Sequence, residues 1–216
     1  GSTLSLLPQA LSPYSVPLGA IAGALAVTSA LYVLTLRSSI GSVSHMLLLG
    51  IAINALAGVG IGVFTWLAND GELRSLTFWS MGSFGGAQWQ SVVPAGAMML
   101  AGLLTLIPTG SNLDRLQLGE RAAHHLGIAV HPLKQRLIFG TAIGVGAAVS
   151  ITGMIGFLGL VVPHIARLLV GVHQRPLMWA SLWLGGTLAV IADIAARTLA
   201  APAEVPVGLL TSAIGA

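Results

Sequence analysis

The chain has 216 residues, of which 55% are hydrophobic and 7% charged, and its formal charge is +3. Its mean hydropathy of +0.91 exceeds what a soluble core of this length can bury, which excludes an ordinary water-soluble globule. The absence of cysteine excludes disulfides and thiolate metal sites. Because the basic residues fall in the gaps between apolar stretches, the positive charge does not indicate a nucleic-acid-binding protein.

Apolar stretches follow one another along the chain, each near the length of a bilayer span, which takes about 20 residues. The glycines of 153–159 and Pro163 interrupt the fifth stretch and predict a discontinuous helix packed inside the fold. The last stretch begins at Val205 and stops at Ala216, so we expect the chain to be part of a longer one. The six stretches before it cover 16–36, 46–67, 91–107, 137–152, 156–170 (the fifth) and 177–194. Together they predict an all-α polytopic membrane protein.

Lys and Arg gather in alternate gaps, which places those gaps in the cytoplasm. The first, third and fifth gaps are therefore expected to face inward, and the gaps at 70–90 and 200–206 outward. Arg74 and Arg197 are the basic residues of the outward gaps. Those of the inward gaps are Arg37, Arg115, Arg121, Lys134, Arg136, Arg167 and Arg175.

Glycines lie inside the apolar stretches, often four residues apart. Small residues at this spacing let helix backbones approach closely in lipid, where apolar side chains alone give helices no reason to associate. The pattern therefore predicts a compact bundle. The pairs are Gly19 and Gly23, Gly58 and Gly62, and Gly140 and Gly144.

Two gaps are too long to be simple turns. The outward segment 69–90 mixes leucines and aromatic residues with polar ones, which predicts a short helix on the outer surface. In the inward segment 108–136, apolar residues recur at roughly helical spacing. They predict two short helices broken near Gly119, with Asn112 or Asp114 as N-cap and Gly127 as terminator.

Four motifs, in this order, carry a family resemblance: LRSLTFWSMGSFGG, LGERAAHHLGI, GFLGLVVPHIARLLVG and ADIAARTLAAPAEVPVGLLTSAIGA. They resemble the permease subunits of bacterial type II ABC importers for haem, iron-siderophores and cobalamin, the FecCD-type permeases. The resemblance implies a ten-helix fold. Residues 1–216, as one transmembrane domain, would supply about helices four to nine and the start of the tenth. It also implies a multi-pass protein of the bacterial inner membrane.

The resemblance implies partners as well: a second copy of the permease, two cytoplasmic ATPase subunits and a periplasmic binding protein, besides the surrounding lipid. Segment 108–136, hereafter the coupling segment, would dock in a groove of the ATPase, and Glu120 could pair with a basic residue there. The expected contact residues are Leu118, Gly119, Glu120, Ala123, His124, Leu126 and Gly127.

Further positions match the family's binding-protein contact, gate and pathway. Arg197 matches an arginine that engages the binding protein, although Asp193, four residues earlier, could simply neutralise it. The cytoplasmic gate corresponds to Ser42, Val43 and Ser44. Asn54 could face the pathway, but a hydrogen bond between helices is at least as plausible for it.

The sequence predicts transport without chemistry in this chain. It contains no nucleophile–base set, no HExxH motif and no Walker motif, so ATP and Mg²⁺ would be bound by the separate ATPase, and this chain needs no cofactor. Its scattered histidines include no pair at i and i+4, so no metal site is expected. Haem is slightly favoured as cargo because of the segment TFWSMGS. The alternative, an ion-gradient-driven secondary transporter, needs carboxylates inside the membrane, and only Asp193 qualifies.

Overall fold

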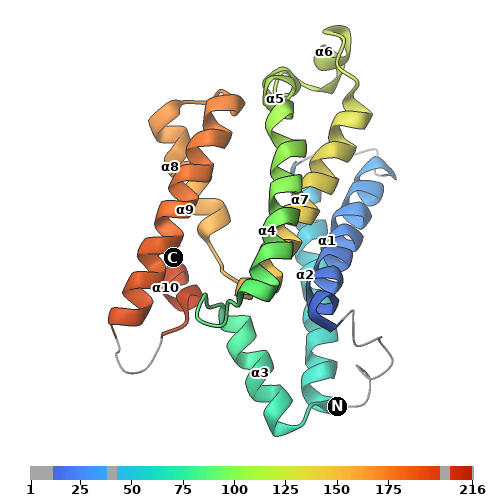
Figure 1. Cartoon of the computed structure of the whole chain (residues 1–216). Helices are drawn as coiled ribbons and strands as arrows, with labels where there is room; N and C mark the ends of the chain where they lie inside the picture. The colour runs from blue at the N-terminus through green and yellow to red at the C-terminus, as the bar shows by residue number, and fades with distance from the viewer. Residues whose placement is uncertain (1–11, 38–42, 200–204, 216) are drawn as a thin grey trace.

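A computed structural model describes residues 12–37, 43–199 and 205–215, and within these ranges every regular element is a helix (Figure 1). The predicted all-α fold is therefore confirmed. The elements are α1 (Ser12–Arg37), α2 (Val43–Leu67), α3 (Asp70–Met81), α4 (Trp89–Leu106), the 3₁₀ turn η3 (Ile107–Thr109), α5 (Gly110–Leu116), α6 (Glu120–His125), α7 (Val130–Thr152), α8 (Leu158–Val170), α9 (Gln174–Thr198) and α10 (Val207–Gly215).

Several helices have the length and composition of membrane spans. In the described part of the chain, four are long and apolar enough to cross a bilayer: Leu48–Leu67, Trp89–Leu116, Val130–Thr152 and Gln174–Thr198. Large apolar side chains such as Phe64, Leu104 and Trp183 are exposed on their outer faces. Helices suit this environment because hydrocarbon offers no hydrogen-bonding partner, and a helix satisfies its backbone internally.

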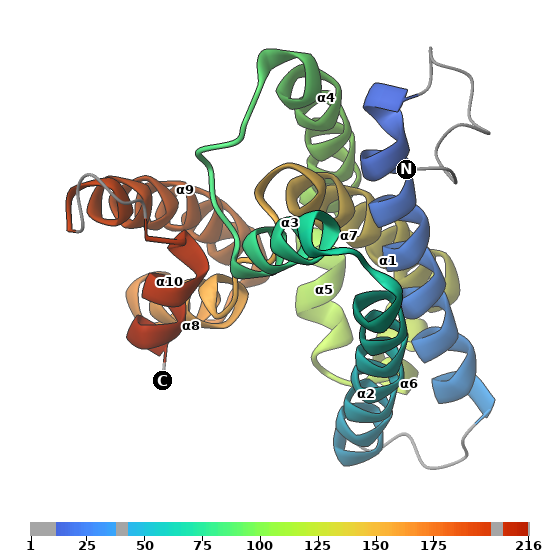
Figure 2. The ribbon, with the colours of Figure 1, turned by 90° about the horizontal axis from the view of Figure 1, so that it is seen from below.

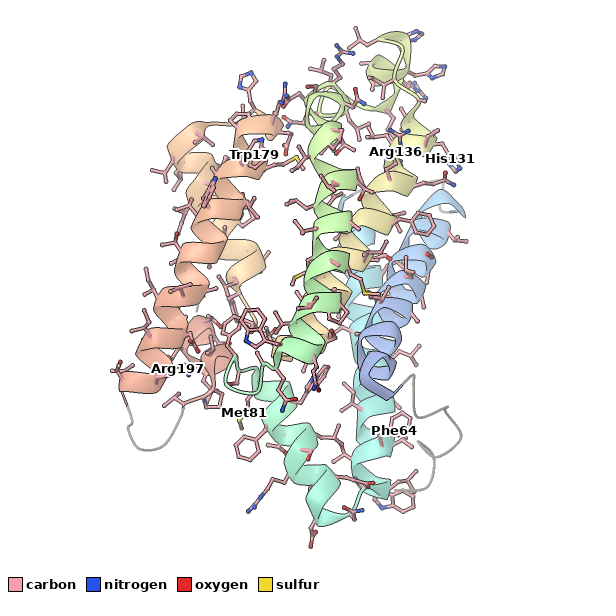
Figure 3. All side chains as sticks on the ribbon, in the orientation of Figure 1. Phe64, Met81, His131, Arg136, Trp179 and Arg197 are labelled. Atoms are coloured by element: carbon pink, nitrogen blue, oxygen red, sulfur yellow. The ribbon has the colours of Figure 1, made fainter. Side chains whose placement is uncertain are left out.

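The helices run between two ends of the molecule, with α5 and α6 at one end and α3 at the other (Figure 1). We call these the α6 end and the α3 end. Seen from the α3 end, the helices form two groups, with α1, α2, α4 and α7 on one side and α8, α9 and α10 on the other (Figure 2). Arg136 lies at the α6 end and Arg197 at the α3 end (Figure 3).

Glycines bring the backbones close together within the first group, where α7 packs on both α4 and α1. A Cβ atom built on Gly102 of α4 would lie 2.7 Å from the Gly140 carbonyl oxygen of α7, and one on Gly146 would lie 2.8 Å from the Ile21 Cα of α1. Close backbone approach through small residues is how helices associate in lipid. Of the predicted pairs, Gly140 and Gly144 lie at this contact, whereas Gly19, Gly23, Gly58 and Gly62 face open space in the described part of the chain.

The predicted break in the fifth apolar stretch lies before α8. Residues 153–157 are not helical, and Phe157, at φ 62°, is the residue that precedes α8. The 13 residues of α8 extend only about 20 Å, less than the ~30 Å hydrocarbon thickness. Pro163 lies inside α8 and does not end it. The glycines therefore cause the discontinuity, and the proline does not.

Three segments far apart in the sequence meet at what we call the glycine node, formed by Gly82, Gly153 and Gly208. A Cβ atom on any of them would overlap a backbone carbonyl oxygen: that of Met154, Trp79 or Met81, respectively. Backbone hydrogen bonds join the same segments, with the Ser83 N–H donating to the Thr152 carbonyl at 2.8 Å and the Gly208 N–H to the Gly82 carbonyl at 3.4 Å. The node thus fixes the end of α3 against the end of α7 and the start of α10.

The α4–α7 contact predicts the effect of adding one methyl group. Gly102→Ala in the full-length protein should lower the free energy of unfolding by about 1–3 kcal/mol, because the new Cβ meets the α7 backbone and the helices must separate. Gly96→Ala on the same helix is the matched control, since a Cβ there meets nothing within 4 Å. Thermal unfolding in detergent measures both variants. Equal transition temperatures for G102A and wild type would contradict the close packing.

Candidate coupling and docking sites

The coupling segment projects from the α6 end as two short helices that continue from α4 and lead into α7 (Figure 1). α5 ends at Leu116 and α6 begins at Glu120, so the predicted break near Gly119 is confirmed. Gly119 has φ 98°, a conformation that glycine adopts without strain. The last residues of the segment already belong to α7, which begins at Val130.

The predicted contact residues of the coupling segment differ in how exposed they are. Leu118 is 68% exposed and Leu126 is 52% exposed, and both histidines of α6 are exposed as well. Ala123 is fully buried in a cluster with Ile128 and Leu133, which holds α6 on α7. Ala123 therefore sets the position of α6, and the exposed leucines provide the apolar surface that a partner could bind.

Glu120 has a partner within this chain. The Lys134 ammonium donates to Glu120 Oε1 at 2.6 Å, with the glutamate side chain 63% exposed and the lysine 25% exposed. Lys134 lies in the first turns of α7, so the ion pair connects α6 to that helix. Exposed pairs stabilise a fold by at most about 1 kcal/mol. The pair therefore orients α6 and contributes little to overall stability.

Gly127 ends α6 as predicted, and it does so through a complete Schellman motif. The Ile128 N–H donates to the Ala123 carbonyl and the Gly127 N–H to the His124 carbonyl, both at 3.0 Å. The φ of Gly127 is 79°. Ala123 and Ile128 also pack together, the apolar contact that accompanies this motif. The chain consequently turns from α6 toward α7 at a fixed angle.

Asp114 does not cap its own helix, because α5 begins at Gly110, and Asn112 lies inside α5 as well. Instead, Asp114 Oδ1 accepts the backbone N–H of Gln174, the first residue of α9, at 2.7 Å. The expectation that Asn112 or Asp114 would cap the first short helix was therefore wrong. No local sequence pattern predicts this contact, because the two residues are 60 positions apart.

The Asp193–Arg197 pair forms as predicted near the end of α9, at the α3 end of the molecule (Figure 3). The guanidinium Nε donates to Asp193 Oδ2 at 2.9 Å, and the arginine side chain remains 49% exposed. The pairing neutralises the carboxylate that the secondary-transporter alternative requires. The Arg197 side chain therefore still reaches the surface.

The outward segment forms an ordered helix, α3, as predicted. A capping box begins it: Asn69 Oδ1 accepts the Glu72 N–H at 3.0 Å, and Glu72 Oε2 accepts the Asn69 N–H at 3.2 Å. No residue of α3 is buried. The helix therefore lies on the surface of the described chain, anchored through the glycine node at its end.

The predicted gate and pathway residues lie on or before α2. Ser42 falls outside the described residues, and Val43 and Ser44 begin α2. Asn54 lies in the middle of α2, and its side chain is exposed. In the described part of the chain, no three His, Asp or Glu residues group in a way that could hold a metal ion.

Comparison with known proteins places these features in a transporter family. The model of the FecCD transport family matches residues 1–216. The chain is 44% identical over 209 residues to the hemin transport system permease protein HmuU of Yersinia pestis, covering 97% of this chain and 62% of that protein. It is 42% identical over 213 residues to the vitamin B12 import system permease protein BtuC of Vibrio vulnificus, covering 99% of this chain and 64% of that protein.

A solved structure has the same arrangement. It is described as an inward-facing conformation of a metal-chelate type ABC transporter, and it superposes with a TM-score of 0.77 at 28% identity, over 93% of this chain and 70% of that one. The chain thus spans a little under two thirds of the length of the permeases named above. These likenesses, with the spanning helices, identify a multi-pass membrane protein of the transport-permease type.

The Schellman motif predicts that the coupling segment depends on Gly127. Gly127→Ala places a side chain at φ 79°, which costs about 1–2 kcal/mol. Hydrogen exchange of the α6 amides should then accelerate by about five- to thirtyfold. Gly86→Ala is the control, because Gly86 has open space around it and no positive φ. Unchanged exchange in G127A would mean that α6 does not rely on this turn.

Proposed function

This chain belongs to the FecCD transport family, and from that membership we propose that it forms part of the permease subunit of an ATP-driven importer for a metal chelate. The single observation that carries the proposal is a bundle of spanning helices with an exposed apolar knob, α5–α6, at the end where basic residues gather. Lys and Arg favour the cytoplasmic side. The α6 end is then cytoplasmic and the α3 end periplasmic, with the protein in the bacterial inner membrane.

In this proposal the permease works as a homodimer with two ATPase subunits, which bind ATP and Mg²⁺. The exposed leucines Leu118 and Leu126 dock in a groove of the ATPase, while Gly119 and Gly127 set the turns on either side of α6. The other exposed contact residues are Glu120 and His124. Because the Ala123 cluster holds α6 on α7 and the Glu120–Lys134 pair orients it, a displacement of the knob reaches the spanning helices. ATP-driven closure of the ATPase thus becomes a rearrangement of the bundle.

The chelate passes along the permease without chemistry. Ser42, Val43 and Ser44 form the cytoplasmic gate, and Asn54 faces the pathway from α2. Weakly polar, small side chains suit this role, because a site that binds the cargo tightly would not release it. We propose haem as the first candidate cargo, with cobalamin and iron-siderophores as the others. HmuU and BtuC, both more than 40% identical, are named for hemin and vitamin B12.

At the periplasmic side, Arg197 engages an acidic residue of a substrate-binding protein. Its side chain, which is 49% exposed, supports this role, and the hydrogen bond to Asp193 orients it. A pair of this kind adjusts association rate and specificity more than total affinity.

Reconstitution tests the function as a whole. The full-length permease, its ATPase and its binding protein are placed in proteoliposomes and offered haem, cobalamin or a ferric siderophore. Uptake of one of them should require hydrolysable ATP. Uptake driven equally well by an ion gradient without ATP would overturn the proposal.

The ATPase contact is tested by Leu126→Glu. A charge in an apolar contact should reduce co-purification of the ATPase by about tenfold or more, the scale of a hot-spot residue. Leu73→Glu, on an exposed leucine at the opposite end, is the control and should leave co-purification unchanged. Equal recovery of the ATPase with L126E and L73E would show that this knob does not bind the ATPase.

Docking of the binding protein is tested by Arg197→Gln. Loss of the positive charge should weaken binding of the partner by about fivefold, with a larger effect at low salt, where screening is weaker. Arg74→Gln changes another exposed arginine at the same end and should bind normally. If both variants bind like the wild type at low salt, Arg197 does not contact the binding protein.

A further inference from the structure

The two groups of helices are joined closely at two places. At the α3 end they meet through the glycine node, where α10 of the second group contacts the ends of α3 and α7. At the α6 end they meet where α5 packs against the beginning of α9. Between these places lies a cavity of about 450 Å³, lined by Leu103 and Leu106 of α4 and by Leu177 and Leu182 of α9, among others.

The junction at the α6 end consists of a short set of contacts from α5 to residues 172–175. The Asp114 carboxylate accepts the Gln174 N–H at 2.7 Å. A Cβ atom on Gly110 would lie 3.1 Å from the Arg175 Cα, so the two backbones almost touch. Gln117 Nε2 also donates to the Val172 carbonyl, at a longer 3.5 Å. We call these contacts the α5–α9 clamp.

Asp114 provides the one charged hydrogen-bond acceptor among the contacts of the clamp. The first N–H groups of a helix have no partner within the helix, and a carboxylate is favoured there by both hydrogen bonding and the helix dipole. His173, the residue before α9, provides no side-chain cap. Asp114 takes that position from another helix, and it is partly buried at the contact. The Gln174 N–H therefore has this carboxylate as its acceptor only while α5 stays against α9.

We propose that Asp114 is a positioning residue that makes α5 and the start of α9 move as one body, so that a displacement of the coupling segment reaches the α8–α10 group directly. This inference rests on the proposed function. The coupling segment is then connected to two spanning helices, α7 and α9. α6 acts on α7 through the Glu120–Lys134 pair and the Ala123 cluster, and α5 acts on α9 through Asp114. Since α9 carries Arg197 near its other end, one helix links the coupling segment to the surface proposed for docking.

Substitution of Asp114 in the full-length permease, assembled with its ATPase and binding protein, tests the clamp. Asp114→Ala should lower the amount of cargo taken up per ATP hydrolysed by about fivefold, the factor that corresponds to loss of a typical helix cap. ATP hydrolysis and co-purification of the ATPase should persist, because the exposed leucines of the knob are unchanged. Asp114→Asn should restore the ratio, since asparagine is as good a cap acceptor as aspartate.

Ser111→Ala, at an exposed position on the same helix, is the matched control. The ratio of uptake to hydrolysis does not depend on how much protein folds, so a merely structural role of Asp114 would leave it unchanged. A D114A protein with the wild-type ratio overturns this inference while the proposed function stands. A wild-type complex without ATP-dependent uptake overturns both.

A crosslink tests whether the clamp stays closed during transport. The chain contains no cysteine, and a Cβ on Gly110 would lie 3.2 Å from the Arg175 Cβ, near the separation of about 3.5–4.5 Å that disulfides span. In a background without other cysteines, oxidation of the G110C/R175C pair should leave uptake at the level measured for the same double variant in its reduced form. Uptake that stops on oxidation and returns on reduction would overturn the inference, because α5 and α9 would then have to separate in each cycle.

Discussion

Close approach between backbones is the constraint on which this fold depends. Helices in lipid gain little from burying apolar side chains against each other, and small residues let their backbones come together instead. The glycine node is the tightest such contact, because it brings residues 82, 153 and 208 together with no room for a side chain. It also supplies hydrogen bonds to the non-helical segment that follows α7, which would otherwise leave polar backbone groups without partners. The node also anchors one end of α3, a helix with no buried residue, at the surface.

The two junctions between the helix groups differ in kind. The glycine node is made of backbone atoms, whereas the α5–α9 clamp depends on one carboxylate and on the close approach of Gly110 to Arg175. The cavity between α4 and α9 limits direct packing of the two groups at that level. A force applied to the coupling segment therefore has a short route into α9 through α5 and another into α7 through α6.

The few charged groups of the chain are used in a way that suits a conduit. Asp193 and Arg197 neutralise one another on α9, and Glu120 and Lys134 do so between α6 and α7. A carboxylate already paired with an arginine is a poor proton or sodium site, which weakens the case for a secondary transporter. The similarity to permeases named for hemin and vitamin B12 agrees with membership of a transport family.

The sequence by itself determined the features that depend on neighbours along the chain. Apolar length predicted the spans, and apolar residues at helical spacing with glycines between them predicted the breaks at Gly119 and Gly127. The mixture of apolar and polar residues predicted the helix α3, and the spacing of Asp193 and Arg197 predicted their ion pair. Only the tertiary structure decided which helix faces meet. It selected Gly102, Gly140 and Gly146 as contacts while Gly58 and Gly62 face open space, and it gave Asp114 a partner 60 residues away. Helical spacing shows which residues share a face of one helix, but which helix covers that face depends on how the whole bundle packs.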